Sequence, residues 1–233
     1  MTLAGTLRRT DAVFFDVDFT LIYPGPAFQG VGYRRFCAAH GIAVDEERFD
    51  GAVRTALADL ENAGHRYHDD IFIQYTRRII EGMGGTGSDG ELNACAREIY
   101  VEWAACHHFH LYDDVADVLT KLFAGGVKVG LISNSHRSLD EFRAHFNLES
   151  VVAAVSSAEH GFMKPHPSIF HAALERAGAR AETSMMVGDS LAHDVAGARG
   201  VGMRSVLLHR APGEPPVVDV PVIRTLAELP LLL

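Results

Sequence analysis

The sequence predicts an α/β protein with a three-layer α/β/α core around a parallel sheet and a small all-helical domain inserted after the first strand. From Asp113 onward, short apolar runs alternate with amphipathic segments, which indicates parallel strands covered by helices on both faces. Between residues 28 and 106, apolar residues recur at helical spacing and no strand pattern appears. We therefore expect residues 1–22 and 111–233 to form the core and residues 23–110 to form the inserted helical domain.

The composition is that of a globular protein and excludes several classes of partner. The chain has 233 residues, of which 48% are hydrophobic and 22% are charged, so it can bury a large core. Its formal net charge of -9 argues against a general binder of nucleic acid or of membrane surfaces, because both need a basic face. A phosphorylated small molecule stays compatible, since a metal and a few local cations can reverse the field in a cleft.

The cysteines indicate a reducing compartment. Cys37, Cys95 and Cys106 are odd in number and form no CxxC pair, so we expect free thiols and neither a disulfide framework nor a zinc site. The first ten residues lack the apolar stretch of a secretory signal, and no later run has transmembrane length. The expected protein is cytoplasmic, a monomer or homodimer, with no nucleic acid or membrane partner.

The first strand is a buried apolar run, Ala12 to Phe15, which ends in two acids. Side chains at Asp16 and Asp18 point to the same side while the strand stays regular, although the chain can already turn at Asp18. Two carboxylates beside an apolar run cost several kcal/mol if they are buried unpaired. A cation or a proton must therefore accompany them.

The inserted segment begins after Tyr23-Pro24-Gly25-Pro26, a sequence that breaks regular structure. Four helical patterns follow. Their apolar stripes have three- and four-residue spacing and consist of Tyr33, Phe36 and Cys37; Phe49, Val53, Ala56, Leu57 and Leu60; Ile71, Phe72, Tyr75 and Ile79; and Leu92, Ala96, Ile99 and Trp103.

The second part of the core alternates helix and strand. Glycines end two of the predicted helices and a proline opens one, as helix termini favour. The predicted helices cover residues 113–123, 139–146, 167–177 and 195–199, and the predicted strands cover 127–132, 151–155, 185–187, 203–208 and 220–223, before a last helical turn.

Polar residues follow several of these strands, where ligands of open parallel sheets bind. They are Asp16 and Asp18, Ser133-Asn134-Ser135, Lys164, and Gly188-Asp189-Ser190. Carboxylates are hard oxygen ligands of the kind that Mg²⁺ prefers, a lysine supplies a point positive charge, and a hydroxyl with neighbouring N–H groups holds an anion. Such a set suits phosphoryl transfer, in which catalysis is mostly positioning and charge neutralisation.

The chain resembles the haloacid dehalogenase-like hydrolase superfamily, in its helical-cap branch. The matching segments are DVDFTL at 16–21, LISNS at 131–135, GFMKPHPSIF at 161–170 and GDSLAHDVAGARGVGM at 188–203, and they occur in family order. The resemblance covers core and insert together. It implies a Rossmann-like core with a cap domain, Mg²⁺ as the cofactor, and a small phosphorylated metabolite as the substrate.

The resemblance also implies roles for individual residues. Asp16 is the nucleophile that forms an aspartyl-phosphate, and Asp18 is the general acid that protonates the leaving alcohol and then the base that activates water. The carboxylates of Asp16 and Asp189 and the backbone carbonyl of Asp18 are the Mg²⁺ ligands. Ser133 and Lys164 hold the transferring phosphoryl group.

The same resemblance concerns four further positions, whose roles in the reaction are less direct. Asp194 orients Lys164 or a metal-bound water, and Thr20 and Asn134 support the phosphate by hydrogen bonding. His193 stands where relatives often have asparagine, a departure that we expect to be tolerated.

Alternatives within the superfamily remain open to different degrees. A phosphotransferase or phosphomutase is possible, since water and a sugar hydroxyl compete for the same aspartyl-phosphate. A 2-haloacid dehalogenase needs no acid for its leaving group, and the acid at position 18 favours phosphate esters instead. A phosphonate hydrolase needs a lysine from its insert, and the chain has none between Asp18 and Lys121. A binding protein with a silent site is disfavoured because every catalytic position is filled.

The insert is expected to close over the site and to contact the leaving group. The residues that we expect to make this contact are Tyr23, Phe28, Arg34, Arg66 and His68.

Overall fold

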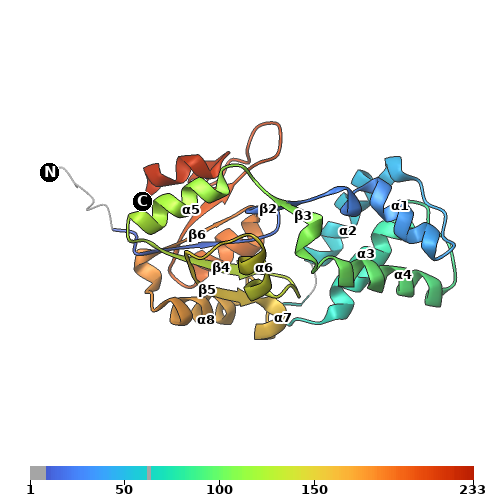
Figure 1. Ribbon diagram of the computed structural model, residues 1–233, viewed down its shortest axis with the longest axis horizontal. Helices are drawn as coiled ribbons and strands as arrows, with labels where there is room; N and C mark the ends of the chain where they lie inside the picture. The colour runs from blue at the N-terminus through green and yellow to red at the C-terminus, as the bar shows by residue number, and fades with distance from the viewer. Residues whose placement is uncertain (1–8, 62–63) are drawn as a thin grey trace.

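The computed structural model describes residues 9–61 and 64–233 and contains a six-stranded sheet (Figure 1). The strand order is β5-β4-β1-β6-β7-β8, and every neighbouring pair is parallel. The strands are β1 (Ala12–Phe15), β4 (Lys128–Ser133), β5 (Val151–Ser156), β6 (Ser184–Gly188), β7 (Arg204–Leu208) and β8 (Val222–Ile223).

The register aligns the carboxyl ends of the central strands. Phe15 of β1 lies opposite Leu131 of β4 on one side and Val187 of β6 on the other. The N–H of Asp16 continues this ladder by donating to the carbonyl of Val187 at 2.9 Å. Asp16, Ser133 and the residues after β6 therefore leave the sheet along one edge, as the sequence predicts.

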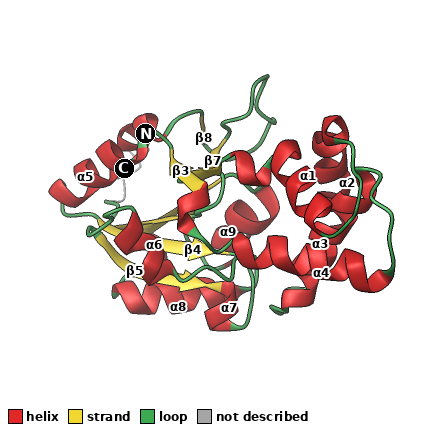
Figure 2. Ribbon diagram, turned by 45° about the vertical axis from the view of Figure 1, so that its right-hand side comes forward, coloured by secondary structure: helices red, strands yellow, loops and turns green. Residues whose placement is uncertain are grey.

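Helices cover both faces of the sheet and complete the predicted α/β/α core (Figure 2). Phe15 packs in a cluster with α5 (Val115–Ala124) and α6 (Leu139–His145), whereas Phe14 packs in a second cluster with α8 (Pro167–Ala177) and α9 (Ala196–Gly200). Alternation along β1 sends these neighbours to opposite faces. Gly130 makes room for the Phe14 ring, because a Cβ at this position would lie 2.4 Å from it.

The inserted segment forms four helices at the end of the molecule remote from the termini, and we call this group the helical lobe (Figure 1). Its helices are α1 (Gly30–Ala39), α2 (Phe49–Glu61), α3 (Asp69–Gly82) and α4 (Asp89–Glu102). A capping box between Ser88 and Glu91 opens α4. The four helices match the predicted stripes, and the domain boundaries at 23 and 110 stay a prediction.

A two-stranded ribbon joins the lobe to the core, and the sequence reading did not anticipate it. The strand β2 (Ile22–Pro24) pairs antiparallel with β3 (Phe109–Leu111), so both chain crossings run side by side. The Pro24-containing turn and the histidines near residue 108 obscured these short strands in the sequence.

Other differences are local. The helix predicted at 195–199 is present as α9, and a π-turn that was not predicted, Leu191–Val195, precedes it; such π-turns are frequent at functional sites. A short helix α7 (Ser157–His160) was not predicted, and the last helical turn is a 3₁₀ segment, Leu226–Leu232. Within the described residues no helix has the length and apolar character needed to cross a membrane. The prediction that residues 1–10 hold no signal falls mostly on residues 1–8, which lie outside the described part.

Candidate active site

Lys164 lies buried between two carboxylates at the carboxyl edge of the sheet. Its Nζ is 2.5 Å from Oδ1 of Asp16 and 2.7 Å from Oδ1 of Asp194. Asp16 follows β1, Lys164 lies in the loop before α8, and Asp194 lies in the π-turn after β6. Three segments that are distant in sequence therefore meet at one ammonium group.

Asp189 completes a group of three carboxylates with Asp16 and Asp194, whose oxygens lie within 4.8 Å of one another. Oδ2 of Asp194 accepts the N–H of Ser190 at 3.0 Å, which fixes this carboxylate over the start of the loop. The close approach requires Gly188, because a Cβ there would lie 2.2 Å from Oδ2 of Asp194.

The pKa shifts reflect this crowding. Burial raises the pKa of Asp16, and the positive charge of Lys164 opposes this rise. The pKa of Asp189 is raised to about 7, first because the carboxyl is withdrawn from bulk water in the cleft and second because Asp194 is negative, although the residue as a whole is exposed. Burial alone would lower the pKa of Lys164, but Asp16 and Asp194 raise it, so the lysine stays charged.

The donor set fits a divalent cation. Three carboxylates and one ammonium leave two uncompensated negative charges at a largely buried site, where desolvation is costly. Because Lys164 and Ser190 already use the oxygens of Asp194, the oxygens of Asp16 and Asp189 are the ones best placed for a metal. Mg²⁺ commonly takes one or two carboxylates together with water and substrate oxygens.

Asp18 does not join this cluster with its side chain. Arg137 donates from one nitrogen to both oxygens of Asp18, at 3.0 and 3.2 Å. A second guanidinium nitrogen donates to the carbonyl of Trp103 at 2.8 Å, and the guanidinium carbon lies 4.4 Å from the centre of the Phe109 ring. Arg137 is only 1% exposed, so a buried cation connects Asp18 to the end of α4 and to the ribbon.

The sequence reading did not single out Arg137. A lone arginine four residues after Ser133 usually lies on the surface, and its partners Asp18 and Trp103 are 119 and 34 residues away. Only the spacing to the SNS segment at 133–135 could have drawn attention to it.

The remaining predicted residues are placed as follows. Asn134 uses both side-chain atoms on the backbone of Lys164, accepting its N–H at 2.7 Å and donating to its carbonyl at 3.0 Å, so it holds the lysine loop. The hydroxyl of Ser133 is buried and donates to that of Ser135 at 3.0 Å. Thr20 is buried, and its Oγ1 has no hydrogen-bond partner among the described residues.

A cavity of about 420 Å³ extends from Asp18 and Asn134 into the helical lobe. Of the five residues predicted to contact a leaving group, Phe28 lines it and the others do not. Arg34 instead forms an ion pair with Glu46 at 2.8 Å, and Arg66 forms a backbone bridge with Phe162 of the core.

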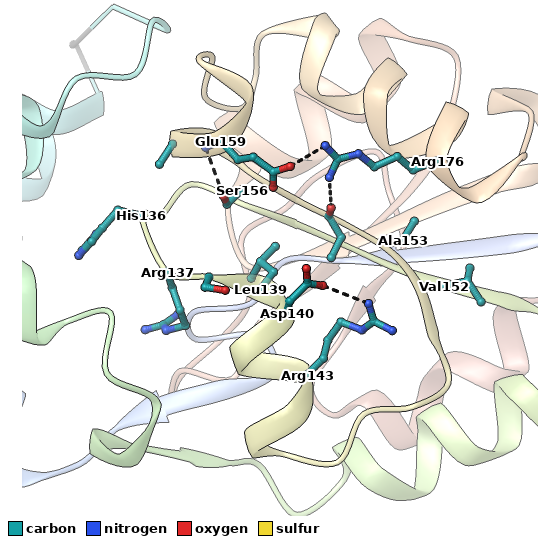
Figure 3. A pocket seen from close by; sticks show the side chains of 13 residues that line it. His136, Arg137, Leu139, Asp140, Arg143, Val152, Ala153, Ser156, Glu159 and Arg176 are labelled. Carbon is teal, nitrogen blue, oxygen red and sulfur yellow. Dashed lines mark hydrogen bonds and ion pairs between the residues drawn. The ribbon is translucent and has the colours of Figure 1, made fainter.

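A larger hollow of about 670 Å³ lies beside α6 and β5 (Figure 3). Its charged groups satisfy one another, since Arg176 donates to Glu159 at 2.8 Å and Arg143 to Asp140 at 3.4 Å. None of the predicted site residues lines this hollow, whereas Asp18 and Asn134 line the smaller cavity. We therefore assign the chemistry to the carboxylate cluster and the smaller cavity.

Comparisons with known proteins agree with this geometry. Residues 10–202 match a family described as haloacid dehalogenase-like hydrolase. The chain is 28% identical to the haloacid dehalogenase-like hydrolase domain-containing protein 3 of Danio rerio, over 94% of each chain. It is 27% identical to the N-acylneuraminate-9-phosphatase of Mus musculus, over 97% of this chain and 95% of the relative. A solved structure, the HAD phosphatase from Thermococcus onnurineus, matches with a TM-score of 0.64 and 25% identity, over 96% of this chain and 97% of the other.

Proposed function

We propose, since the chain belongs to the haloacid dehalogenase-like hydrolase family, that it is a Mg²⁺-dependent phosphatase acting on a small phosphate monoester. The observation that carries the proposal is the convergence of Asp16, Lys164, Asp189 and Asp194 on one point. Relatives and a structural neighbour named as phosphatases support it.

The nucleophile is Asp16. Lys164 contacts Oδ1, and attack on phosphorus is assigned to the second oxygen, Oδ2. The attack forms an aspartyl-phosphate as the bond to the leaving oxygen breaks, and water then hydrolyses this intermediate. Lys164 faces the charge that develops on the phosphoryl oxygens, and Asp194 fixes the direction of its ammonium group.

Magnesium, when bound at Asp16 and Asp189, neutralises phosphoryl and carboxylate charge during the transfer. Asp189 must be ionised to serve as a ligand. Burial and then the negative charge of Asp194 raise the pKa of Asp189 to about 7, and a cation bound there would favour its ionised form.

Asp18 supplies the proton to the leaving alcohol and afterwards accepts one from the attacking water. Arg137 fixes its carboxylate at the boundary between the core and the lobe. Ser133, at the end of β4, is the hydroxyl assigned to the phosphoryl group, and Asn134 holds the Lys164 loop in place.

The same proposal places the protein in the cytoplasm. The cysteines of the sequence support this location, since three thiols without a CxxC pair are typical of a protein from a reducing compartment.

The test is Mg²⁺-dependent release of phosphate from p-nitrophenyl phosphate and acetyl phosphate, with Asp16→Asn as the inactive reference. Hydrolysis by the native chain that Asp16→Asn and EDTA each abolish supports the proposal. Hydrolysis that survives Asp16→Asn overturns it. Adding sugar phosphates separates a mutase, which would yield isomerised product in place of free phosphate.

A further inference from the structure

We propose that the leaving group of the substrate is uncharged and apolar, an aryl or alkyl alcohol that the cavity of about 420 Å³ encloses. This inference rests on the proposed phosphatase function and adds the chemical class of the substrate. The cavity lies within the size range of pockets that enclose small organic ligands.

The position of the cavity makes it the place for a leaving group. It begins at Asp18, the group assigned to protonate the leaving oxygen, and at Asn134, which holds the Lys164 loop. From there it continues between all four helices of the lobe. A phosphoryl group held at Lys164 would therefore direct its ester oxygen past Asp18 and its organic part into the lobe.

The walls of the cavity are mostly hydrocarbon. Aliphatic and aromatic side chains from the helices line most of it, and they include Phe49, Val53, Leu57, Leu60, Phe72, Ile79, Ile99 and Trp103. Three of the lining hydroxyls are already engaged, because Tyr33 bonds with Thr76 and Tyr100 bonds with Tyr67. A polyhydroxylated leaving group would meet hydrocarbon over most of this surface, and unpaired buried polar groups are costly.

The cavity also lacks positive charge. Among its described lining residues there is no lysine or arginine, and the acids are Asp18 and Asp50. Burial, and then the charge of Arg137, lowers the pKa of His136, so this ring is neutral near pH 7. Burial raises the pKa of Tyr75 to about 12, so its hydroxyl is also neutral. A leaving group with a carboxylate or a second phosphate would find no free cation among these lining residues, because Arg137 beside the cavity is already paired with Asp18.

Phe19 adds an apolar ring to the cavity lining next to Asp18. It adopts a φ of 63°, a left-handed conformation that is unusual for a bulky residue, and its side chain is 46% exposed next to Asp18. Such strain persists where the surroundings enforce it and is frequent at ligand sites. The ring lines the cavity, and its centre lies 6.5 Å from the centre of the Trp103 ring. It therefore offers an apolar face to the first atoms of a leaving group.

The test compares n-alkyl phosphates from ethyl to octyl with ω-carboxyalkyl phosphates of equal length. The alkyl series keeps the leaving oxygen and its charge constant while the apolar length grows. We expect kcat/KM to rise about fourfold for each added methylene until the cavity is filled, because each buried methylene contributes about 0.8 kcal/mol. Each ω-carboxyalkyl phosphate should react at least about tenfold more slowly than the alkyl phosphate of the same length, because its carboxylate enters an anionic, apolar site.

Acetyl phosphate separates this inference from the proposed function, since it needs no apolar pocket. Turnover of acetyl phosphate combined with an alkyl series that stays flat would overturn the apolar leaving group and leave the phosphatase intact. Absence of turnover on every ester and on acetyl phosphate would overturn both.

Two variants locate the effect in the cavity. Val53→Lys, and Leu57→Lys at a site that is 43% exposed and so tolerates charge more readily, should flatten the alkyl series and raise turnover of the carboxyalkyl esters. Val101→Lys, on an exposed side of α4 outside the cavity, is the matched control and should keep the native slope. A native slope in folded Leu57→Lys would overturn the assignment of the leaving group to this cavity.

Discussion

Replacing Arg137 by methionine tests the link between Asp18 and the helical lobe. The change removes two donor contacts to Asp18 and one to the carbonyl of Trp103 while keeping much of the side-chain volume. Breaking a buried ion pair typically costs 3–5 kcal/mol, and we expect about 3 kcal/mol because Asp18 keeps some access to water. For a chain of this length the melting temperature should fall by roughly 6–12 °C.

The effect on catalysis should depend on the leaving group. With Arg137 absent, Asp18 loses the donors that fix its direction, and proton transfer to a poor leaving group suffers most. We expect kcat on an alkyl phosphate to fall on the order of 100-fold, and on p-nitrophenyl phosphate by less than about tenfold. The assay is steady-state kinetics on both substrates for the native chain, Arg137→Met, Asp18→Asn and the double variant.

The double variant decides the outcome. If Arg137 acts through Asp18, adding Arg137→Met to Asp18→Asn should cost little more on the alkyl phosphate than Asp18→Asn alone. Arg199→Met, which removes an exposed ion pair with Asp219, serves as the control for loss of an arginine. Equal losses on both substrates, or additive losses in the double variant, would refute the reasoning and leave Arg137 with a purely structural role.

Three further outcomes follow from the site and its supports. Asp16→Asn should lose essentially all turnover, at least about 1,000-fold in kcat, with an unchanged circular dichroism spectrum, because an amide is a poor nucleophile. Gly188→Ala should weaken Mg²⁺ binding, measured by calorimetry, because the new Cβ would displace the carboxylate of Asp194, which accepts the N–H of Ser190 and so holds the loop that carries the proposed ligand Asp189. Burial alone would raise the pKa of Asp114, but hydrogen bonds from Arg210, Thr225 and Leu226 lower it. Asp114→Asn should therefore cost about 2 kcal/mol at neutral pH. Because the folded pKa lies below the unfolded value, this difference should shrink as pH falls below about 4, and urea titrations at several pH values would measure it.

Much of the fold could be predicted because its signals are local. The apolar run before Asp16, the helical stripes of the lobe and the glycine and proline boundaries are patterns within about ten residues, and each is set by the period of one element. The polar residues that end β1, β4 and β6 could be placed on one edge because parallel strands share a direction.

Other features depend on pairings between distant residues. Lys164 meets Asp16 across 148 positions, and Arg137 meets Asp18 across 119, and no periodicity in the sequence indicates which partners will touch. The ribbon of β2 and β3 was not predicted because strands of three residues are too short to show a recognisable sequence pattern. Such strands are stabilised by pairing with each other.

The residue types of the proposed phosphoryl-transfer site could therefore be predicted along the chain, whereas the character of the proposed leaving-group cavity could not. Acids, a lysine and a serine can be recognised as candidate site residues from their type and from their position after a predicted strand. The cavity is the space that four helices leave between them, so its charge and shape are fixed by which faces pack together. Burial against the core selects those faces, and it is a property of the folded chain as a whole.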